Sequence, residues 1–298
     1  MVATERSVAA MPDPMTVISA VRPDLAGEPM QLLTDGWDCL AVEVGDILFK
    51  LPKHAAAAER LRREPAFLDL VRPLTDLALP QMRLHTRPVV MSEHVKIVGA
   101  AVDAARYGDL GDAARSRLAH DLARFFAAVH SLGPEKVRRL DCDAVRPWAA
   151  AGDIIAPIAA AVAAGVLERE VLDLAWARLA AHEGHGADEL VCGQFDTHGW
   201  NMAFDPVAER LVGLFDFAGA GIGALHRDLS YPTFVSPDLT RRITARYTVL
   251  TGRHVDIGRV FDAHGALRVI ELSDALKDGD DPTQFVDALQ AHIAWNHG

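Results

Sequence analysis

The chain has 298 residues, of which 50% are hydrophobic and 24% are charged, an ordinary composition for a folded globular protein. This composition excludes a disordered or fibrous chain, and the length is sufficient for one large domain or two lobes. The formal net charge of −11 repels nucleic acid phosphates, so nucleic acid is excluded as the main partner and cationic ligands are weakly favoured.

The cysteines and the start of the chain indicate the compartment. Cys39, Cys142 and Cys192 are far apart and form no CxxC pair, which argues against a disulfide framework and against a thiolate zinc site. The first residues lack the pattern of a secretory signal, and no apolar run reaches membrane-spanning length. We therefore expect a cytoplasmic protein without a membrane partner.

The first third of the chain predicts a small antiparallel sheet. Residues 1–14 are small and polar, and we expect a mobile tail there. Residues 54–71 are rich in helix formers, and Pro73 ends that pattern. Short apolar runs predict strands at 30–33, 39–44, 47–51, 82–85 and 88–91. With residues 92–95 as a connector, residues 15–93 form an N-terminal lobe with one helix.

The remaining residues, 94–298, predict a mostly helical C-terminal lobe. Apolar positions at helical spacing predict helices at 112–131, 152–164, 168–182, 238–251, 257–275 and 282–296. Short strands are predicted at 190–192, 202–204 and 211–215. No internal repeat and no low-complexity linker interrupt this pattern.

One segment of this lobe carries the chemistry. From Gln194 onward the chain reads QFDTHGWNMAFDPVAERLVGLFDF. Asp196 and Asn201 lie five positions apart, and Asp216 follows a short apolar strand. In phosphoryl transfer, an aspartate accepts the proton of the attacking hydroxyl, while an asparagine and a second aspartate hold magnesium. The spacing predicts Asp196 as the base and Asn201 and Asp216 as metal ligands.

The order of the motifs resembles the aminoglycoside phosphotransferase and small-molecule kinase family, a branch of the protein-kinase-like fold, over roughly residues 30 to 235. The stretches that carry the resemblance are 35–38, 49–52, 58–64, 125–130, 194–216 and 228–229. The resemblance implies a two-lobed α+β fold. It also implies an enzyme that uses Mg²⁺ and moves the γ-phosphoryl of ATP or GTP to a small molecule.

The resemblance also implies a nucleotide site in the N-terminal lobe. Lys50 would contact the α- and β-phosphates and would be oriented by Glu64, with Glu59 as the less favoured partner. Gly36 either covers the phosphates or forms a plain turn. From their position in the family pattern, Ser92, Glu93 and Val95 would supply backbone hydrogen bonds to adenine.

Two substitutions depart from the family pattern. Gln194 stands where the family usually has histidine, and Phe195 replaces a common glycine. The proline that often precedes the asparagine is also absent. Because glutamine can donate a side-chain hydrogen bond, we expect retained activity, and a nucleotide-binding pseudokinase stays open as an alternative.

The acceptor is the least determined part of the prediction. Acidic residues of the C-terminal helices line the amine site in the family, so Glu271 and Asp274 are candidates, with a solvated helix face as the plainer interpretation. His198 either touches substrate or packs. Asp228 is a further candidate for a substrate contact, and the resemblance implies that it supports the loop. We expect an aminoglycoside-type antibiotic as acceptor, hence a resistance enzyme; choline, homoserine, sugars and macrolides stay open, as does the oligomeric state.

A histidine pair offers a competing metal site. His182 and His185 are three positions apart, but they lack the HExxH spacing of a zinc site. A solvated loop is the favoured interpretation.

Overall fold

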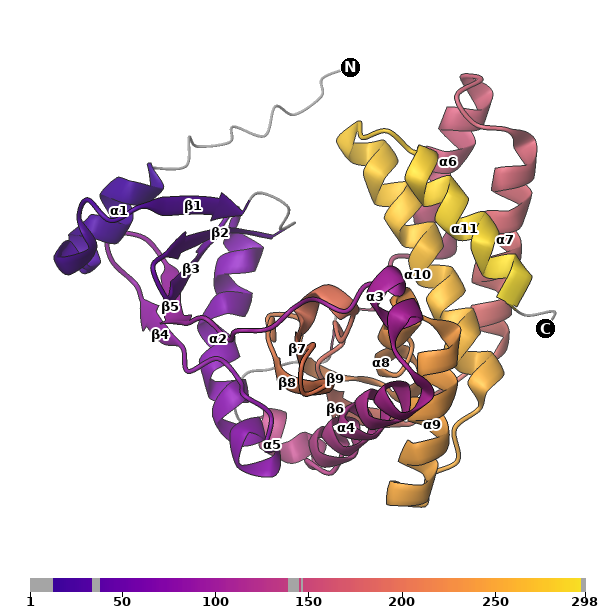
Figure 1. Ribbon diagram of the computed structural model, residues 1–298. Coiled ribbons are helices and arrows are strands. Elements are labelled where there is room, and N and C mark those ends of the chain that lie inside the picture. The colour runs from indigo at the N-terminus through magenta and orange to yellow at the C-terminus, as the bar shows by residue number, and fades with distance from the viewer. Residues whose placement is uncertain (1–12, 34–37, 139–144, 146, 296–298) are drawn as a thin grey trace. The chain divides into compact units, whose positions relative to one another are not determined.

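The computed structural model describes residues 13–33, 38–138, 145 and 147–295, with side chains to His292 (Figure 1). Of the predicted tail at residues 1–14, residues 1–12 lie outside the described residues, as does Gly36; Asp13 and Pro14 instead begin a helix. The chain divides into two compact units, and we describe each by itself. Unit 1 comprises the residues up to Val98 together with Gly213–Gly219, and unit 2 comprises the rest. Unit 1 therefore reaches beyond residue 93 and contains Asp216.

Unit 1 is built on a five-stranded antiparallel sheet, as the apolar runs predicted. Its strand order is β1-β2-β3-β5-β4. The strands are β1 (Met30–Leu33), β2 (Cys39–Val44), β3 (Ile47–Pro52), β4 (Arg83–His85) and β5 (Met91–Val95). A tight turn joins β2 to β3, where Gly45 has a φ of +57°, which glycine adopts without steric cost.

The two faces of this sheet have different roles. On one face, Val42 pairs with Phe49, and both join a core that includes Val17 and Ile18 of helix α1 (Pro14–Val21). Since side chains alternate along a strand, Lys50 projects from the opposite face. That face therefore presents the predicted phosphate contact.

Helix α2 (Ala55–Val71) confirms the predicted first helix. His54 caps its N-terminus, because the His54 ring accepts from the backbone N–H of Ala57. Leu61 and Leu68 are fully buried, and each such side chain contributes roughly 1.5 to 3 kcal/mol through burial. These apolar contacts anchor the helix that presents Glu64.

The structure differs from the prediction at two places in this unit. Helix α1 was not predicted, although Asp13 before Pro14 is a typical helix start. The Asp13 carboxylate caps this helix by accepting from the backbone N–H of Thr16. The predicted strand at 88–91 and connector at 92–95 were also misplaced, since β5 runs Met91–Val95. Its polar residues pair with β3 inside the sheet, where the pattern of apolar runs could not find them.

Unit 2 is mostly helical, as predicted. Its helices are α3 (Ala104–Asp109), α4 (Asp112–His130), α5 (Pro134–Arg138), α6 (Ala151–Ala163), α7 (Arg169–Gly184), α8 (Leu225–Asp228), α9 (Pro237–Thr251), α10 (Ile257–Asp278) and α11 (Thr283–Trp295). The six long ones match the predicted helices, whereas the short α3, α5 and α8 were not predicted. Helices α6, α7, α10 and α11 lie side by side (Figure 1), and their side chains form one apolar core that includes Ile158, Leu272 and Leu289.

Short strands flank the predicted catalytic segment. They are β6 (Leu190–Gly193), β7 (Met202–Asp205), β8 (Arg210–Leu214) and β9 (Gly221–Ala224). β6 pairs with β9, and β7 pairs with β8. The loop of residues 194–201 joins β6 to β7, so both of its ends are fixed by strand pairing. Among the described residues, we find no helix with the length and apolar character needed to span a bilayer.

Candidate active site

The loop between β6 and β7 brings together Asp196 and Asn201. The Asn201 side-chain amide nitrogen donates to the backbone oxygen of Asp196 at 2.8 Å and to its Oδ2 at 2.9 Å. A short 3₁₀ turn, Gly199–Asn201, closes this loop. Because the amide nitrogen faces Asp196, the amide oxygen points the other way, as a metal ligand requires. The five-residue spacing thus produces the paired geometry expected of a catalytic loop.

His198 lies beside the carboxylate of Asp196. Its Nε2 is 3.3 Å from Asp196 Oδ1, and its ring contacts those of Trp200 and Phe234 at centroid distances of 5.6 and 6.2 Å. The Asp196 side chain is 36% exposed, so an acceptor hydroxyl can reach it. His198 belongs to the surroundings of Asp196, while Trp200 was not singled out from the sequence.

Gln194 supports the start of this loop. Its side chain is fully buried, and its Oε1 accepts from the Thr197 hydroxyl at 2.8 Å. The next residue, Phe195, has a φ of +59°, a left-handed conformation that costs roughly 1 to 3 kcal/mol in a non-glycine residue. Its backbone N–H donates to Asp228 Oδ1 at 2.5 Å, which offsets that strain.

Asp228 is a buried support of the loop. Its Oδ2 lies 2.9 Å from Nε2 of His130, and Nδ1 of His130 lies 2.9 Å from the Tyr247 hydroxyl. Asp228 is fully buried, so it supports the loop and is not a substrate contact. The sequence analysis did not predict that His130 contacts Asp228. The position of His130 at the end of the 125–130 motif was the signal that could have indicated it.

Replacing Asp228 should destabilise the protein strongly. We expect Asp228→Ala to lower the free energy of unfolding by about 3–5 kcal/mol, because the buried His130 and the N–H of Phe195 lose their partner. Urea denaturation followed by circular dichroism measures the loss. The matched control is Asp153→Ala on the exposed surface of α6, which should cost less than about 1 kcal/mol. Equal losses in both variants would contradict the assignment.

Gly199 is required by close packing. A Cβ there would collide with the carbonyl oxygen of Val102, whose N–H donates to the Gly199 oxygen at 3.0 Å. We expect Gly199→Ala to lower the free energy of unfolding by about 1–3 kcal/mol. Gly152 in α6 has open space around it, so Gly152→Ala should gain about 0.5–1 kcal/mol. Urea denaturation of both variants measures whether the two changes in the free energy of unfolding have opposite signs.

In unit 1, Lys50 contacts two carboxylates. Its Nζ lies 3.0 Å from Asp216 Oδ1 and 3.5 Å from Glu64 Oε1. Burial alone would lower the pKa of Lys50, but the charges of Asp216 and Glu64 outweigh burial and raise that pKa. The lysine is therefore charged. Asp216 is the exposed member of the three, at 39% of its side chain.

Glu64, rather than Glu59, is the partner of Lys50. Glu64 is buried, and its Oε1 also accepts from the backbone N–H of Phe217 at 2.8 Å. Glu59 is 60% exposed and pairs with Arg62 on the helix surface. Burial raises the pKa of Glu64 more than Lys50 lowers it. Asp216 has a φ of +62°, and such strain is typical of functional sites.

The three residues expected to contact adenine lie in β5. Ser92 and Glu93 have β3 on one side and β4 on the other, so neighbouring strands flank their backbone groups. The Glu93 carboxylate faces α1 and accepts from Arg22 at 3.0 Å. Val95 pairs with Ile47 of β3 alone. Only Val95 is placed to offer backbone groups to a ligand.

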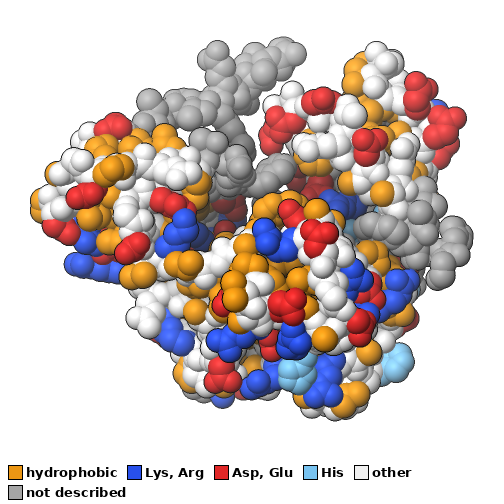
Figure 2. Space-filling view, in the orientation of Figure 1, with side chains coloured by type: hydrophobic (Ala, Val, Ile, Leu, Met, Phe, Trp, Pro, Cys, Tyr) orange, Lys and Arg blue, Asp and Glu red, His pale blue; other side chains and the backbone are white. Residues whose placement is uncertain are grey.

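The acidic stretch of α10 is already neutralised in part. Glu271 pairs with Arg268 at 3.0 Å, and Asp274 pairs with Lys277 at 2.8 Å. Burial raises the pKa of Glu271. Beyond them, Asp278, Asp280 and Asp281 are exposed at the end of the helix, where carboxylates gather on the surface (Figure 2). This part of the stretch is a solvated face.

The two histidines at the end of α7 have other partners. Nε2 of His185 lies 2.7 Å from Asp262, while the His182 ring packs against Trp148 with a centroid distance of 4.6 Å. No group of three histidine, cysteine or acidic residues is arranged to hold a metal ion anywhere in the described part of the chain. The favoured interpretation as a solvated loop was wrong, because His182 lies within α7 and both side chains are partly buried.

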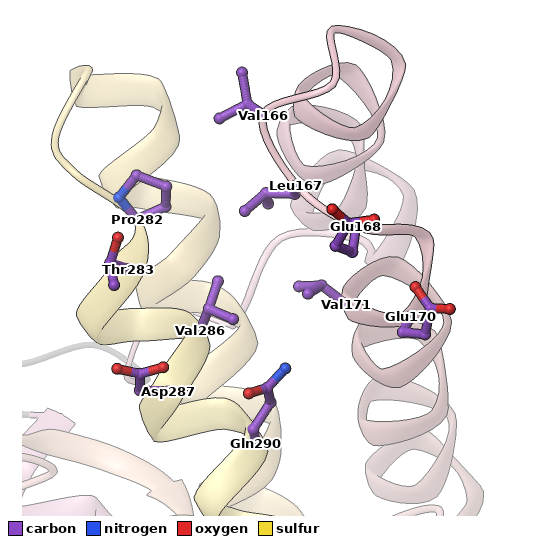
Figure 3. Close-up of a pocket in the computed structure, with 10 residues that line it drawn as sticks. All are labelled: Val166, Leu167, Glu168, Glu170, Val171, Pro282, Thr283, Val286, Asp287 and Gln290. Atoms are coloured by element: carbon purple, nitrogen blue, oxygen red, sulfur yellow. The ribbon is translucent and has the colours of Figure 1, made fainter.

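A pocket of about 420 Å³ lies between the α6–α7 turn and α11 (Figure 3). Val166, Leu167 and Val286 give it apolar walls, and Glu168 and Asp287 add carboxylates. None of the predicted site residues lines it. We therefore do not assign it to the acceptor.

The fold and these two clusters define a phosphotransferase of the kinase-like class. A model of the phosphotransferase enzyme family matches residues 30–259, and the chain belongs to this family. No curated protein is similar enough in sequence to count as a match.

Solved structures share the fold at low sequence identity. The chain resembles APH(2″)-IIIa bound to GDP and kanamycin, with a TM-score of 0.80 and 21% identity, covering 94% of this chain and 98% of that one. It also resembles the macrolide 2′-phosphotransferase MphH from Brachybacterium faecium, with a TM-score of 0.64 and 18% identity, covering 92% and 97%. Both likenesses support the two-lobed fold.

Proposed function

We propose that this phosphotransferase moves the γ-phosphoryl group of ATP or GTP to a hydroxyl of a small polar molecule. The observation that carries the proposal is the contact of Lys50 with both Asp216 and Glu64. A charged lysine held between two carboxylates, one exposed and one buried, is the arrangement that binds nucleotide phosphates beside a metal ligand.

Each cluster has a defined part in the reaction. Lys50 binds phosphate oxygens, Glu64 orients Lys50, and the N–H and C=O groups of Val95 hold the base. Asp196 accepts the proton of the acceptor hydroxyl, for which its exposure and its fixed position suit it.

Each of the two predicted metal ligands has the chemistry that magnesium requires. The exposed carboxylate of Asp216 and the outward-facing amide oxygen of Asn201 are the hard oxygen ligands that Mg²⁺ prefers. When bound, Mg²⁺ would neutralise charge on the phosphate oxygens. These two residues are the ligands we propose.

An aminoglycoside-type antibiotic is the first acceptor to test. The family and the kanamycin complex of one solved relative support this choice. The net charge of −11 also favours a cationic acceptor.

A second candidate is a larger and less cationic acceptor such as a macrolide. Two observations favour it: Arg268 neutralises Glu271, and Trp200, whose side chain contacts His198, is 60% exposed. An exposed aromatic ring near the proposed base offers apolar contact instead of charge.

Turnover against an acceptor panel tests the proposal. Wild type is mixed with ATP or GTP and with aminoglycosides, macrolides, choline or small hydroxylated metabolites, and release of nucleoside diphosphate is followed. We expect acceptor-dependent release with one compound class. Nucleotide binding without turnover on any acceptor would favour the pseudokinase alternative.

A further inference from the structure

Two buried polar side chains on the Lys50 face of the unit 1 sheet lack hydrogen-bond partners. They are Ser92, whose Oγ is unpartnered, and His94, whose Nδ1 is unpartnered among the described residues. Ser92 is fully buried and His94 is only 5% exposed. A buried polar atom without a partner is unfavourable, so such atoms usually mark a missing ligand or water.

The strand register shows where these side chains lie. Ser92 pairs directly with Lys50, and His94 pairs directly with Leu48. Residues opposite each other in an antiparallel pair project from the same face. His94 therefore shares the face of Lys50, one step of about 7 Å further along the strand.

The direction of that step identifies the part of the nucleotide that His94 meets. Lys50 is the proposed phosphate contact, and Val95 is the proposed backbone contact for the base. Lys50 pairs with Ser92, and His94 lies two residues beyond Ser92, directly before Val95. His94 therefore lies on the base side of Lys50 along the strand.

We infer that His94 is a contact for the purine base and lets the site accept adenine and guanine alike. This inference rests on the proposed use of a nucleotide. A neutral imidazole has one donor and one acceptor nitrogen, and either can be Nδ1. Nδ1 can therefore accept from the amino group of adenine or donate to the O6 oxygen of guanine.

The surroundings of His94 keep its ring neutral. Burial, and secondarily the charge of Lys50, lower the pKa of His94 to about 4. At neutral pH the ring can therefore change tautomer without taking up a charge. His85, on the opposite face of the sheet beside Glu93, provides a matched histidine with no place in this site.

Equilibrium binding of nucleotides to the full chain tests the inference. The probes are ATP, GTP, purine riboside triphosphate, which lacks the 6-substituent, and inorganic tripolyphosphate, each with Mg²⁺. We expect His94→Leu to weaken ATP and GTP about three- to tenfold, the effect of one neutral hydrogen bond, and to leave tripolyphosphate unchanged. His94→Asn keeps a donor and an acceptor near Nδ1 and should restore binding, and His85→Leu should change nothing.

The analogue separates the outcomes further. Purine riboside triphosphate should bind wild type more weakly than ATP, and His94→Leu should shrink that difference by the same factor. An undiminished difference in a folded His94→Leu variant would overturn the contact. If His94→Leu does not fold, His94→Asn decides. The contact is supported if wild type prefers ATP to the analogue and His94→Asn keeps this preference. Equal binding of ATP and the analogue by wild type overturns the contact. Failure of wild type to bind any nucleotide would instead overturn the proposed function.

Discussion

An Asp196→Asn variant is expected to lose at least about a hundredfold in kcat, because general base catalysis contributes roughly 10²–10⁴-fold. The asparagine keeps the size of the side chain, and the Asn201 amide can still donate to the backbone oxygen of residue 196. Only the ability to take a proton is removed. Steady-state kinetics with the best acceptor of the panel measures the loss.

The matched control for this variant is Asp173→Asn. Asp173 lies on α7, is 61% exposed and pairs with Arg169 at the surface. Its kinetics should equal those of wild type. Nucleotide binding should be the same in Asp196→Asn and wild type. Full activity of Asp196→Asn would exclude this residue as the base.

A Lys50→Met variant is expected to lose about a hundredfold or more in kcat/KM, since removal of one preorganised donor to developing charge costs about 10²–10³-fold. Stability should fall as well, by up to about 3 kcal/mol, because Glu64 stays buried without its cation. Kinetics measures the first effect, and urea denaturation measures the second.

A second substitution separates these two effects. Adding Glu64→Gln to Lys50→Met removes the buried carboxylate, so most of the lost stability should return while activity stays low. The surface variant Glu59→Gln should change neither quantity, since Glu59 pairs with Arg62 in solvent. Unchanged stability of the single Lys50→Met variant would show that the buried pair is not the support we assign to it.

The sequence predicted that Asp196 and Asn201 lie together, because their contact is local. Asp196 and Asn201 lie five positions apart on one loop, so spacing alone brings them together. Lys50 and Glu64 are far apart in sequence, and only the resemblance to a family joined them, while the contact of Lys50 with Asp216 was not predicted. The structure then distinguished Glu64 from Glu59, because it shows which carboxylate is buried.

Contacts between distant residues explain what the sequence could not show. Glu93 belongs to the connector predicted from the sequence, but Arg22, 71 positions away, neutralises its carboxylate within the sheet. His94 belongs to the same predicted connector, and only its pairing with Leu48 shows that it lies on the Lys50 face. The acidic stretch of α10 suggested an amine site, but Arg268 already pairs with Glu271.

Transfer of a labelled γ-phosphoryl group tests the central claim most directly. Wild type and Asp196→Asn are each incubated with γ-labelled ATP or GTP, Mg²⁺ and the acceptor panel, and the products are separated. The account predicts label on a hydroxyl of one acceptor with wild type and a loss of at least about a hundredfold with Asp196→Asn. Label found only in inorganic phosphate, or equal transfer by both proteins, would contradict it.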